Sequence, residues 1–216
     1  MMALPYIYVC SVWIAWISSL RSFRLDFPFH LKLFSCLLGL TALVELTALI
    51  LPTFFHIRNN WLYNSFTLVE FWIYGYYYTW LIRKLILRRI LFVFLVIFPI
   101  FWFITVFFQY GFFTWNSSVI VVGSFFSVVF AIMYYYQIIT HTEILSLRSL
   151  PEFWIATGML IFYLGSLPFF GMLNFLGRSH ANIVLKLYAV LTVLNILMYS
   201  LFTYGFLCRI TNTTKS

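Results

Sequence analysis

The sequence predicts an all-α integral membrane protein that crosses the bilayer seven times. Of its 216 residues, 64% are hydrophobic and only 8% are charged, whereas a soluble domain carries about 25% charged residues. Aromatic residues make up 23% of the chain, and Tyr and Trp rings gather at membrane–water interfaces. The chain also contains seven apolar runs of roughly the 20 residues that a spanning helix needs.

The first three runs end at basic or helix-breaking residues. The first carries no charge and ends before Arg21. The second begins after His30 and ends near Pro52. The third begins at Trp61 and ends before Arg83. Charged residues are costly inside the bilayer, so they mark where each predicted helix leaves it.

The remaining four runs are also bounded by polar segments. The basic segment 83–89 precedes the fourth run, and the segment 110–116 precedes the fifth. Residues 140–152 and 175–182 flank the sixth, which contains Pro168, a residue that is expected to kink a helix. The predicted helices cover residues 4–20, 32–51, 61–82, 90–109, 117–138, 153–174 and 183–207.

All connections between the predicted helices are short. We therefore expect neighbouring helices to be antiparallel and residues 1–216 to form a single domain. A membrane β-barrel is a poor alternative, because its strands alternate apolar and polar residues and these runs do not.

The distribution of basic residues predicts the orientation. Cytoplasmic connections of membrane proteins are enriched in Lys and Arg. With the N-terminus outside, ten of the 13 basic residues lie on the cytoplasmic side. Those ten are Arg21, Arg24, Lys32, Arg83, Lys84, Arg88, Arg89, Arg148, Arg209 and Lys215; the three outside are Arg58, Arg178 and Lys186. The sequence thus predicts a cytoplasmic C-terminus, and the net charge of +8 indicates topology rather than nucleic-acid binding.

Two of the five acidic residues, Glu45 and Glu70, lie within predicted helices. A carboxyl group at membrane depth costs on the order of 2.5–3.5 kcal/mol and normally faces the interior of a bundle. At about 1.5 Å per residue, both lie some 10–14 Å below the outer boundary. We therefore expect one shared cavity in the outer half of the bundle.

Polar residues follow one face of helix 61–82 and one face of helix 183–207. Their spacing of three or four residues matches the helical period. A third polar face, in helix 32–51, contains Glu45. The candidate ligand or ion pocket consists of Glu45, Glu70, Asn64, Thr67, Tyr74, Tyr188, Thr192, Asn195 and Tyr199.

Three interpretations of these polar faces are open. They form interhelical hydrogen bonds, each worth roughly 0.6–2 kcal/mol; or they line a ligand or ion pocket; or they relay protons. In helix 117–138, three small residues at four-residue spacing form a surface for close helix contact, including contact with a second copy. These are Gly123, Ser127 and Ala131.

Catalytic and cofactor chemistry lack support in the sequence. Neither predicted side of the membrane has three histidines for a zinc site, and no phosphate-binding glycine loop is present. Lys186 is too near the end of the last helix for a retinal Schiff base. We expect no cofactor, no metal and no nucleic-acid partner.

Three segments resemble a group of uncharacterised small seven-helix bacterial integral membrane proteins. They are Leu62–Glu70 (LYNSFTLVE), Asn116–Gly123 (NSSVIVVG) and Pro151–Gly158 (PEFWIATG) with the following Tyr163-Leu164-Gly165. The resemblance implies a multi-pass protein of the bacterial cytoplasmic (inner) membrane. It favours a signalling partner and assigns no role to particular residues.

Two functions are compatible with these observations. The first is a non-catalytic sensor or receptor that binds a small ligand and acts through a membrane or signalling partner. The second is a small-solute or ion transporter or channel. Residues 62–74 match 187–199 at several positions, with Glu70 over Asn195, which is typical of a three-plus-one-plus-three helix duplication. A receptor should have an outer pocket sealed below by aromatic packing, and a transporter a path that reaches the membrane midplane.

Overall fold

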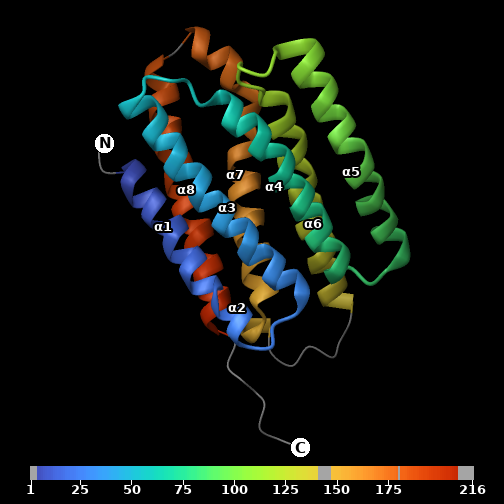
Figure 1. Ribbon diagram of the computed structural model, residues 1–216. Coiled ribbons are helices and arrows are strands. Elements are labelled where there is room, and N and C mark those ends of the chain that lie inside the picture. The colour runs from blue at the N-terminus through green and yellow to red at the C-terminus, as the bar shows by residue number, and fades with distance from the viewer. Residues whose placement is uncertain (1–3, 141–146, 180, 209–216) are drawn as a thin grey trace, which may run out of the picture.

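The computed structural model describes residues 4–140, 147–179 and 181–208, with the backbone alone over 172–185. Seven long helices run up and down through the described chain (Figure 1). They are α1 (Leu4–Ser19), α3 (Phe29–Phe54), α4 (Asn60–Leu81), α5 (Leu85–Ile104), α6 (Ser117–Thr140), α7 (Pro151–Ser179) and α8 (Ala181–Cys208). Short segments are α2 (Arg21–Arg24), the π-helical η1 (Thr105–Tyr110) and the 3₁₀ turn η2 (Leu147–Ser149). The all-α prediction is confirmed.

The predicted helix ends differ most from the structure at α5 and α7. The predicted fourth helix begins at residue 90, whereas α5 begins at Leu85 and includes Arg88 and Arg89. Both arginines are exposed, so they extend their charged ends away from the apolar helix. α7 continues through Pro168 as far as Ser179. A basic pair or a proline therefore does not end these helices.

Five of the helices in the described chain, α3 and α5 to α8, are long and apolar enough to cross a membrane. The chain is therefore a helical membrane protein. α1 has 16 residues and is shorter than those five. α4 has 22 residues but is less apolar, because polar residues such as Asn64, Thr67 and Glu70 lie along one side of it.

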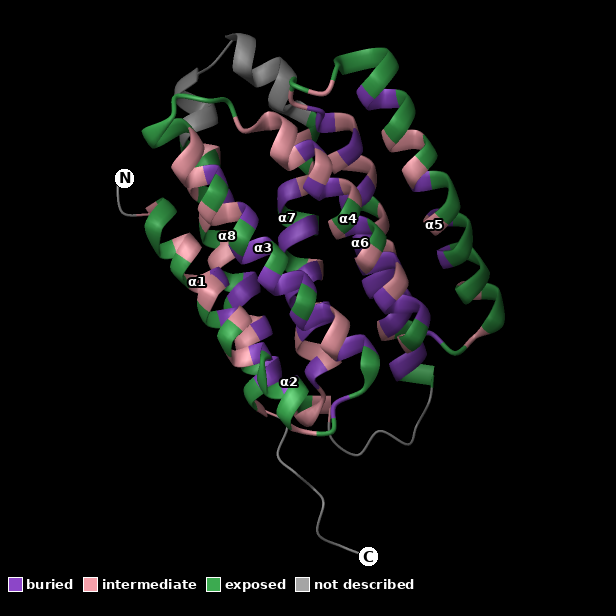
Figure 2. Ribbon diagram, viewed as in Figure 1, coloured by how far each residue is buried: buried purple, intermediate pink, exposed green. Residues whose placement is uncertain are grey.

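Six of the helices form a closed ring, and α5 lies outside it. α1 packs against α3 and α8, α3 against α4, α4 against α6, α6 against α7, and α7 against α8. α5 packs mainly on the outer side of α4 and lies at one edge of the bundle (Figure 1). Only 28% of its most apolar stretch is buried, against 56% in α6, and Figure 2 shows most of its surface as exposed.

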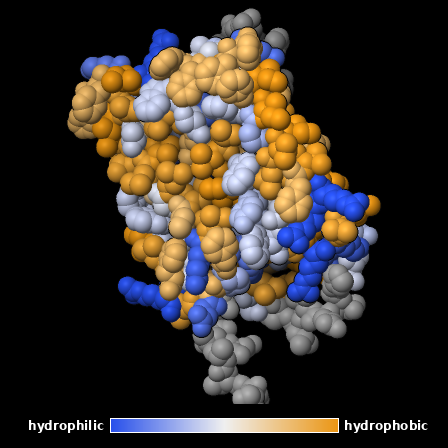
Figure 3. Space-filling model, turned by 45° about the vertical axis from the view of Figure 1, so that its right-hand side comes forward, coloured by the Kyte–Doolittle hydropathy of each residue, from blue (hydrophilic) through white to orange (hydrophobic). Residues whose placement is uncertain are grey.

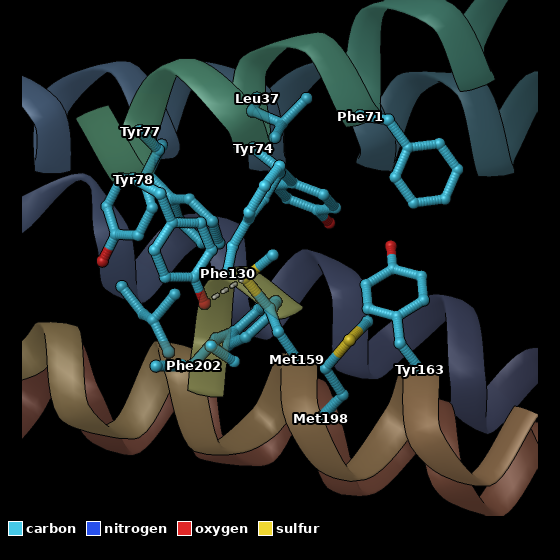
Figure 4. Close-up of a cluster of buried hydrophobic side chains, with 14 of the residues drawn as sticks. Leu37, Phe71, Tyr74, Tyr77, Tyr78, Phe130, Met159, Tyr163, Met198 and Phe202 are labelled. Carbon is cyan, nitrogen blue, oxygen red and sulfur yellow. Dashed lines mark hydrogen bonds between the residues drawn. The ribbon is translucent and has the colours of Figure 1, made fainter. Parts of the chain in front are cut away.

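The centre of the ring is filled by aromatic side chains. Phe34, Tyr77, Tyr78, Phe130 and Phe202 are at most 1% exposed and come from α3, α4, α6 and α8. Figure 4 shows the labelled rings of this group pointing from facing helices toward one another. These five residues are called the aromatic floor below, because they lie beneath the cavity described in the next subsection.

The small residues of α6 pack inside the bundle. Gly123, Ser127 and Ala131 are all buried. A Cβ atom at Gly123 would overlap the ring of Phe71 on α4. All three are therefore packed within the chain, and the contact with a second copy through them stays an untested prediction. Their small size serves the close approach of α6 to α4.

Basic residues gather at one end of the bundle. We call the end where α1, α4, α6 and α8 begin the N-terminal end, and the other the opposite end (Figure 1). Basic residues in α2, in the α4–α5 connection and in η2 all lie at the opposite end. Figure 3 shows hydrophilic side chains toward the ends of one face and a hydrophobic belt between them, as expected for a chain surrounded by lipid.

Candidate functional site

A cavity of about 670 Å³ lies inside the ring, in the half nearer the N-terminal end. All six ring helices contribute to its wall, and α5 does not. Asn59 and Asn60, where the chain passes from α3 to α4, also line it, so the cavity extends toward that end of the bundle. Its polar lining residues are Tyr8, Thr41, Glu45, Asn59, Asn60, Tyr63, Thr67, Glu70, Tyr163, Tyr188, Thr192, Asn195 and Tyr199.

Glu45 lies on α3 and faces the cavity. The hydroxyl of Tyr63 on α4 donates a hydrogen bond to Glu45 Oε2 at 3.1 Å. Tyr8 of α1 lies within interaction range of the same carboxyl group. The side chain keeps part of its surface accessible although it is inside the bundle, because the cavity provides the space.

Glu70 lies on α4 and is held by two tyrosines. Tyr74, one helical turn further along α4, donates to Glu70 Oε1 at 3.0 Å. Tyr163 of α7 donates to the same oxygen at 3.3 Å, and Figure 4 shows its hydroxyl directed toward α4. The second oxygen, Oε2, has no hydrogen-bond partner among the described residues. One carboxyl oxygen is therefore fixed, and the other remains free to accept.

The structure brings Glu45 and Glu70 together. Both line the same cavity, and they are near enough to interact electrostatically. This is the arrangement that the shared-cavity hypothesis requires. Of the other predicted pocket residues, five also line the cavity: Thr67, Tyr188, Thr192, Asn195 and Tyr199.

Tyr74 and Asn64 do not line the cavity. Tyr74 lies beneath the cavity. Its ring centroid is 6.1 Å from that of Phe34, and its hydroxyl donates a hydrogen bond to Glu70. Asn64 is buried, and its amide donates to the carbonyl oxygens of Phe112 at 2.8 Å and Thr114 at 2.7 Å. Asn64 thus ties α4 to the segment that joins η1 to α6. The hydrogen bonds of these two residues hold the structure together, within α4 for Tyr74 and between α4 and a connection for Asn64.

The lining residues absent from the predicted pocket include four aromatic residues that carry a polar group: Tyr8, Tyr63, Trp115 and Tyr163. Each is an aromatic residue in or beside an apolar run, where a ring at the lipid interface is equally expected. For Tyr63 a signal was present, since it lies seven residues before Glu70, on the same side of α4. The other three lie on helices or loops whose inward face the sequence leaves unmarked.

The aromatic floor closes the cavity on the side of the opposite end. The ring centroid of Phe34 lies 5.2 Å from the ring centroid of Tyr77 and 5.2 Å from that of Phe202. Those of Tyr78 and Phe130 lie 5.9 Å apart. Tyr77 and Tyr78 follow Glu70 by two helical turns, which corresponds to about 10–12 Å along α4. Polar lining therefore gives way within that distance to closely packed rings.

Comparisons with protein-family models, with curated proteins and with solved structures found no match. The resemblance to small seven-helix bacterial proteins therefore stays a prediction. The position and chemistry of the cavity residues are what indicate a role for this chain.

Among the described residues, no group of three or more His, Cys, Asp or Glu side chains lies together. His30 Nε2 pairs with Glu152 Oε1 at 3.0 Å, which joins α3 to α7 near the opposite end. His141 and His180 lie outside the residues whose side chains are described. The carboxyl groups of the cavity are thus too few for a metal site built from this part of the chain alone.

Proposed function

We propose that this protein is a non-catalytic membrane receptor or sensor, which binds a small ligand in the cavity and acts through a partner protein. The observation that carries the proposal is a cavity with two carboxyl groups in its wall, which extends toward one end of the bundle and is closed on the other side by the aromatic floor. A path for transport would need polar lining beyond this layer. A binding site needs only the cavity.

The size and lining of the cavity suit a small molecule. Ligand pockets commonly measure about 300–1,000 Å³, with mainly apolar walls and a few placed polar groups. The volume here is about 670 Å³. Phe66, Phe71 and Phe162 provide apolar wall. The carboxyl groups of Glu45 and Glu70 are held in place by tyrosine hydroxyls, so polar contacts are preformed.

A series of packed side chains connects the cavity with the opposite end. Tyr74 bonds to Glu70 and packs on Phe34, which packs on Tyr77. Tyr77 lies 5.7 Å from the ring of His30, which pairs with Glu152 on α7. Ligand binding that shifts Glu70 would therefore bear on the contact between α3 and α7. Coupling through such contacts requires that the two sites bias a common change of conformation.

The partner is proposed to bind at the opposite end, where the connections carry most of the described basic residues. By the positive-inside rule this end faces the cytoplasm, with the N-terminus outside. The proposed location is the cytoplasmic membrane of a bacterium, in line with the resemblance described above. The ligand would then enter from outside the cell.

A transporter is the second candidate, and one observation favours it. α5 lies outside the ring. In the sequence it stands between the long helices α1, α3 and α4 and the long helices α6, α7 and α8, as the linking helix of a three-plus-one-plus-three duplication would. The positions matched in that duplication, Thr67 with Thr192 and Glu70 with Asn195, all line the cavity. Parallel repeats place substrate between two such halves.

A ligand screen with a blocked cavity tests the receptor proposal. Thr192→Phe fills the cavity from α8, and Val193→Phe on the lipid-exposed side of the same helix is the matched control. The purified protein in lipid nanodiscs is screened by thermal unfolding against a chemically diverse set of small molecules. We expect compounds that raise the unfolding temperature of the wild type and of Val193→Phe but not of Thr192→Phe.

The same compounds are then tested for flux into vesicles that contain the wild-type protein. Binding without flux supports the receptor. Saturable flux that Thr192→Phe abolishes would replace the receptor by the transporter. A screen without any compound that depends on the cavity would contradict both functions.

A further inference from the structure

We propose that the ligand is a small organic cation, whose protonated amino group lies between Glu45 and Glu70 and whose apolar body lies against the aromatic wall. This inference rests on the proposed function, because it names the chemical class that the same cavity would bind. It applies to a receptor and to a transporter alike.

The charge of the lining selects for cations. Glu45 and Glu70 are the ionisable acidic residues of the wall, and no Lys, Arg or His lines the cavity in the described chain. This contrasts with a chain whose formal net charge is +8. The described part of the wall therefore offers acceptors to a cation and no counter-charge to an anion. A charge in a low-dielectric site needs such a partner.

The hydrogen-bond geometry also calls for a donor. Tyr74 and Tyr163 both donate to Oε1 of Glu70, which leaves Oε2 without a partner among the described residues. An ionised carboxyl group can only accept hydrogen bonds, and an ammonium group has only donors. A protonated amine would therefore donate a hydrogen bond to Oε2 of Glu70, the oxygen that its tyrosines do not reach. It would also contact Glu45 across the cavity.

Aromatic rings form much of the remaining wall. Phe66, Phe71, Trp115, Phe162 and Phe170 line the cavity together with the tyrosines. The faces of aromatic rings attract cations, and they also pack against the apolar part of an organic molecule. The same wall can thus bind both parts of an amine with a hydrocarbon or aromatic body.

An inorganic cation fits this cavity poorly. Ca²⁺ takes six to eight oxygen ligands at about 2.3–2.6 Å, and Mg²⁺ requires a tight octahedron. Here two carboxyl groups face a space of about 670 Å³ with an aromatic wall. Such a space leaves a bare ion with few ligands, whereas an organic cation fills it.

A series of compounds that share a phenylethyl group and differ in the charge of the head group tests the inference. The probes are 2-phenylethylamine (cationic), 2-phenylethanol (neutral) and 3-phenylpropanoate (anionic), measured by calorimetry and thermal unfolding at neutral pH in nanodiscs of zwitterionic lipid. Wild type should bind the amine at least about tenfold more tightly than the alcohol, with no measurable binding of the carboxylate. Thr192→Phe should abolish that binding.

Substitution of the carboxyl groups supplies the second arm. Glu70→Gln and Glu45→Gln should each reduce the affinity for the amine by at least about tenfold while leaving that for the alcohol unchanged. Asp26→Asn, which removes an exposed carboxyl group near the opposite end, should leave both unchanged. If a cavity variant fails to fold, the preference of wild type among the three probes decides the question alone.

The outcomes separate this inference from the proposed function. Suppose that the wild type binds the alcohol as tightly as the amine, or prefers the carboxylate, and that Thr192→Phe abolishes this binding. Such a result would overturn the inference that the ligand is a cation and would leave the receptor proposal intact. Binding of the amine that Thr192→Phe does not affect would place it outside the cavity and overturn the inference. If no probe binds at millimolar concentration, the inference also fails, and the diverse screen described above judges the function separately.

Discussion

Both tyrosine partners of Glu70 donate to one of its oxygens, and this asymmetry shows how a single acidic residue is accommodated in a membrane protein. A carboxyl group at membrane depth costs on the order of 2.5–3.5 kcal/mol unless it finds partners or water. Tyr74 and Tyr163 supply part of that compensation. The cavity supplies the remainder by giving Glu70 a polar space to face.

Asn64 contrasts with Glu70, although both lie on the polar side of α4. Its two hydrogen bonds to loop carbonyl groups leave its amide nitrogen fully occupied. We predict that Asn64→Ala lowers the free energy of unfolding by about 1–3 kcal/mol, because two hydrogen bonds of a buried amide, each worth about 0.5–1.5 kcal/mol, are lost. Detergent-based equilibrium unfolding measures this change.

The exposed Gln109 provides the control for that substitution. Gln109→Ala should change the free energy of unfolding only slightly. If Asn64→Ala were as stable as Gln109→Ala, the bonds to the η1–α6 segment would contribute nothing, and the structural role of Asn64 would be refuted.

At the scale of the helix, α4 is the element on which the site depends. It contributes one of the two carboxyl groups, supports it with Tyr74, and provides two rings of the aromatic floor. Its position is fixed from three directions, by α3, α5 and α6. At its end, Gln137 of α6 donates to the carbonyl oxygen of Leu81 at 2.8 Å and accepts from the backbone of Arg83 at 2.5 Å.

The contact of α4 with α6 predicts the effect of a methyl group at Gly123. Gly123→Ala places a Cβ against the ring of Phe71, which is 2% exposed and has little room to move. Overpacking of this kind costs about 1–3 kcal/mol. We expect a lower unfolding temperature, and a weaker response to cavity ligands because Phe71 lines the cavity.

Gly171 is the matched control, since a Cβ there meets no atom within 4 Å. Gly171→Ala should be as stable as the wild type or slightly more stable, because Ala favours helix over Gly by about 1 kcal/mol. A result in which both variants behave alike would argue against close packing of α6 on α4.

At the scale of the molecule, successive long helices run in alternating directions, so the basic connections lie together at the opposite end. The positive-inside rule then predicts a cytoplasmic opposite end. Phe113→Cys and Asp26→Cys, each in a background without Cys10, Cys36 and Cys208, place one exposed thiol at either end. A membrane-impermeant maleimide should label Phe113→Cys in intact cells.

Asp26→Cys should react with the maleimide only after the membrane is permeabilised. Labelling of both variants after permeabilisation is the control for thiol reactivity. The reverse pattern in intact cells would invert the proposed orientation, and the ligand would then reach the cavity from the cytoplasm.

Much of this architecture could be predicted from the sequence, because apolar length and helical period are local properties. The seven helices follow from run length. The meeting of Glu45 and Glu70 follows from their depths and from the cost of a carboxyl group facing lipid. The helical period, however, tells which side of a helix faces inward, not whether a group there is already bonded, which is why Asn64 was assigned to the pocket.

The arrangement of whole helices was less accessible. The place of α5 outside the ring depends on contacts between distant segments. Its sequence does carry a signal, since it has the highest mean hydropathy of the five spanning helices, 2.9. A helix that is apolar on all sides has no face that must avoid lipid. Tyr8 and Tyr163 could not be distinguished from rings at the lipid interface.

The polar side of α4 also bears on biosynthesis. Helices enter the bilayer from the translocation machinery according to their own hydrophobicity. Glu70, in the middle of α4, makes the insertion of this helix less favourable. α3 precedes α4 by a connection of five residues, Phe55–Asn59, and packs against it. We therefore expect the two helices to insert together as a hairpin. α4 would then acquire its place in the bilayer from its neighbours, and the groups that make the cavity polar would be sheltered from lipid as the chain is made.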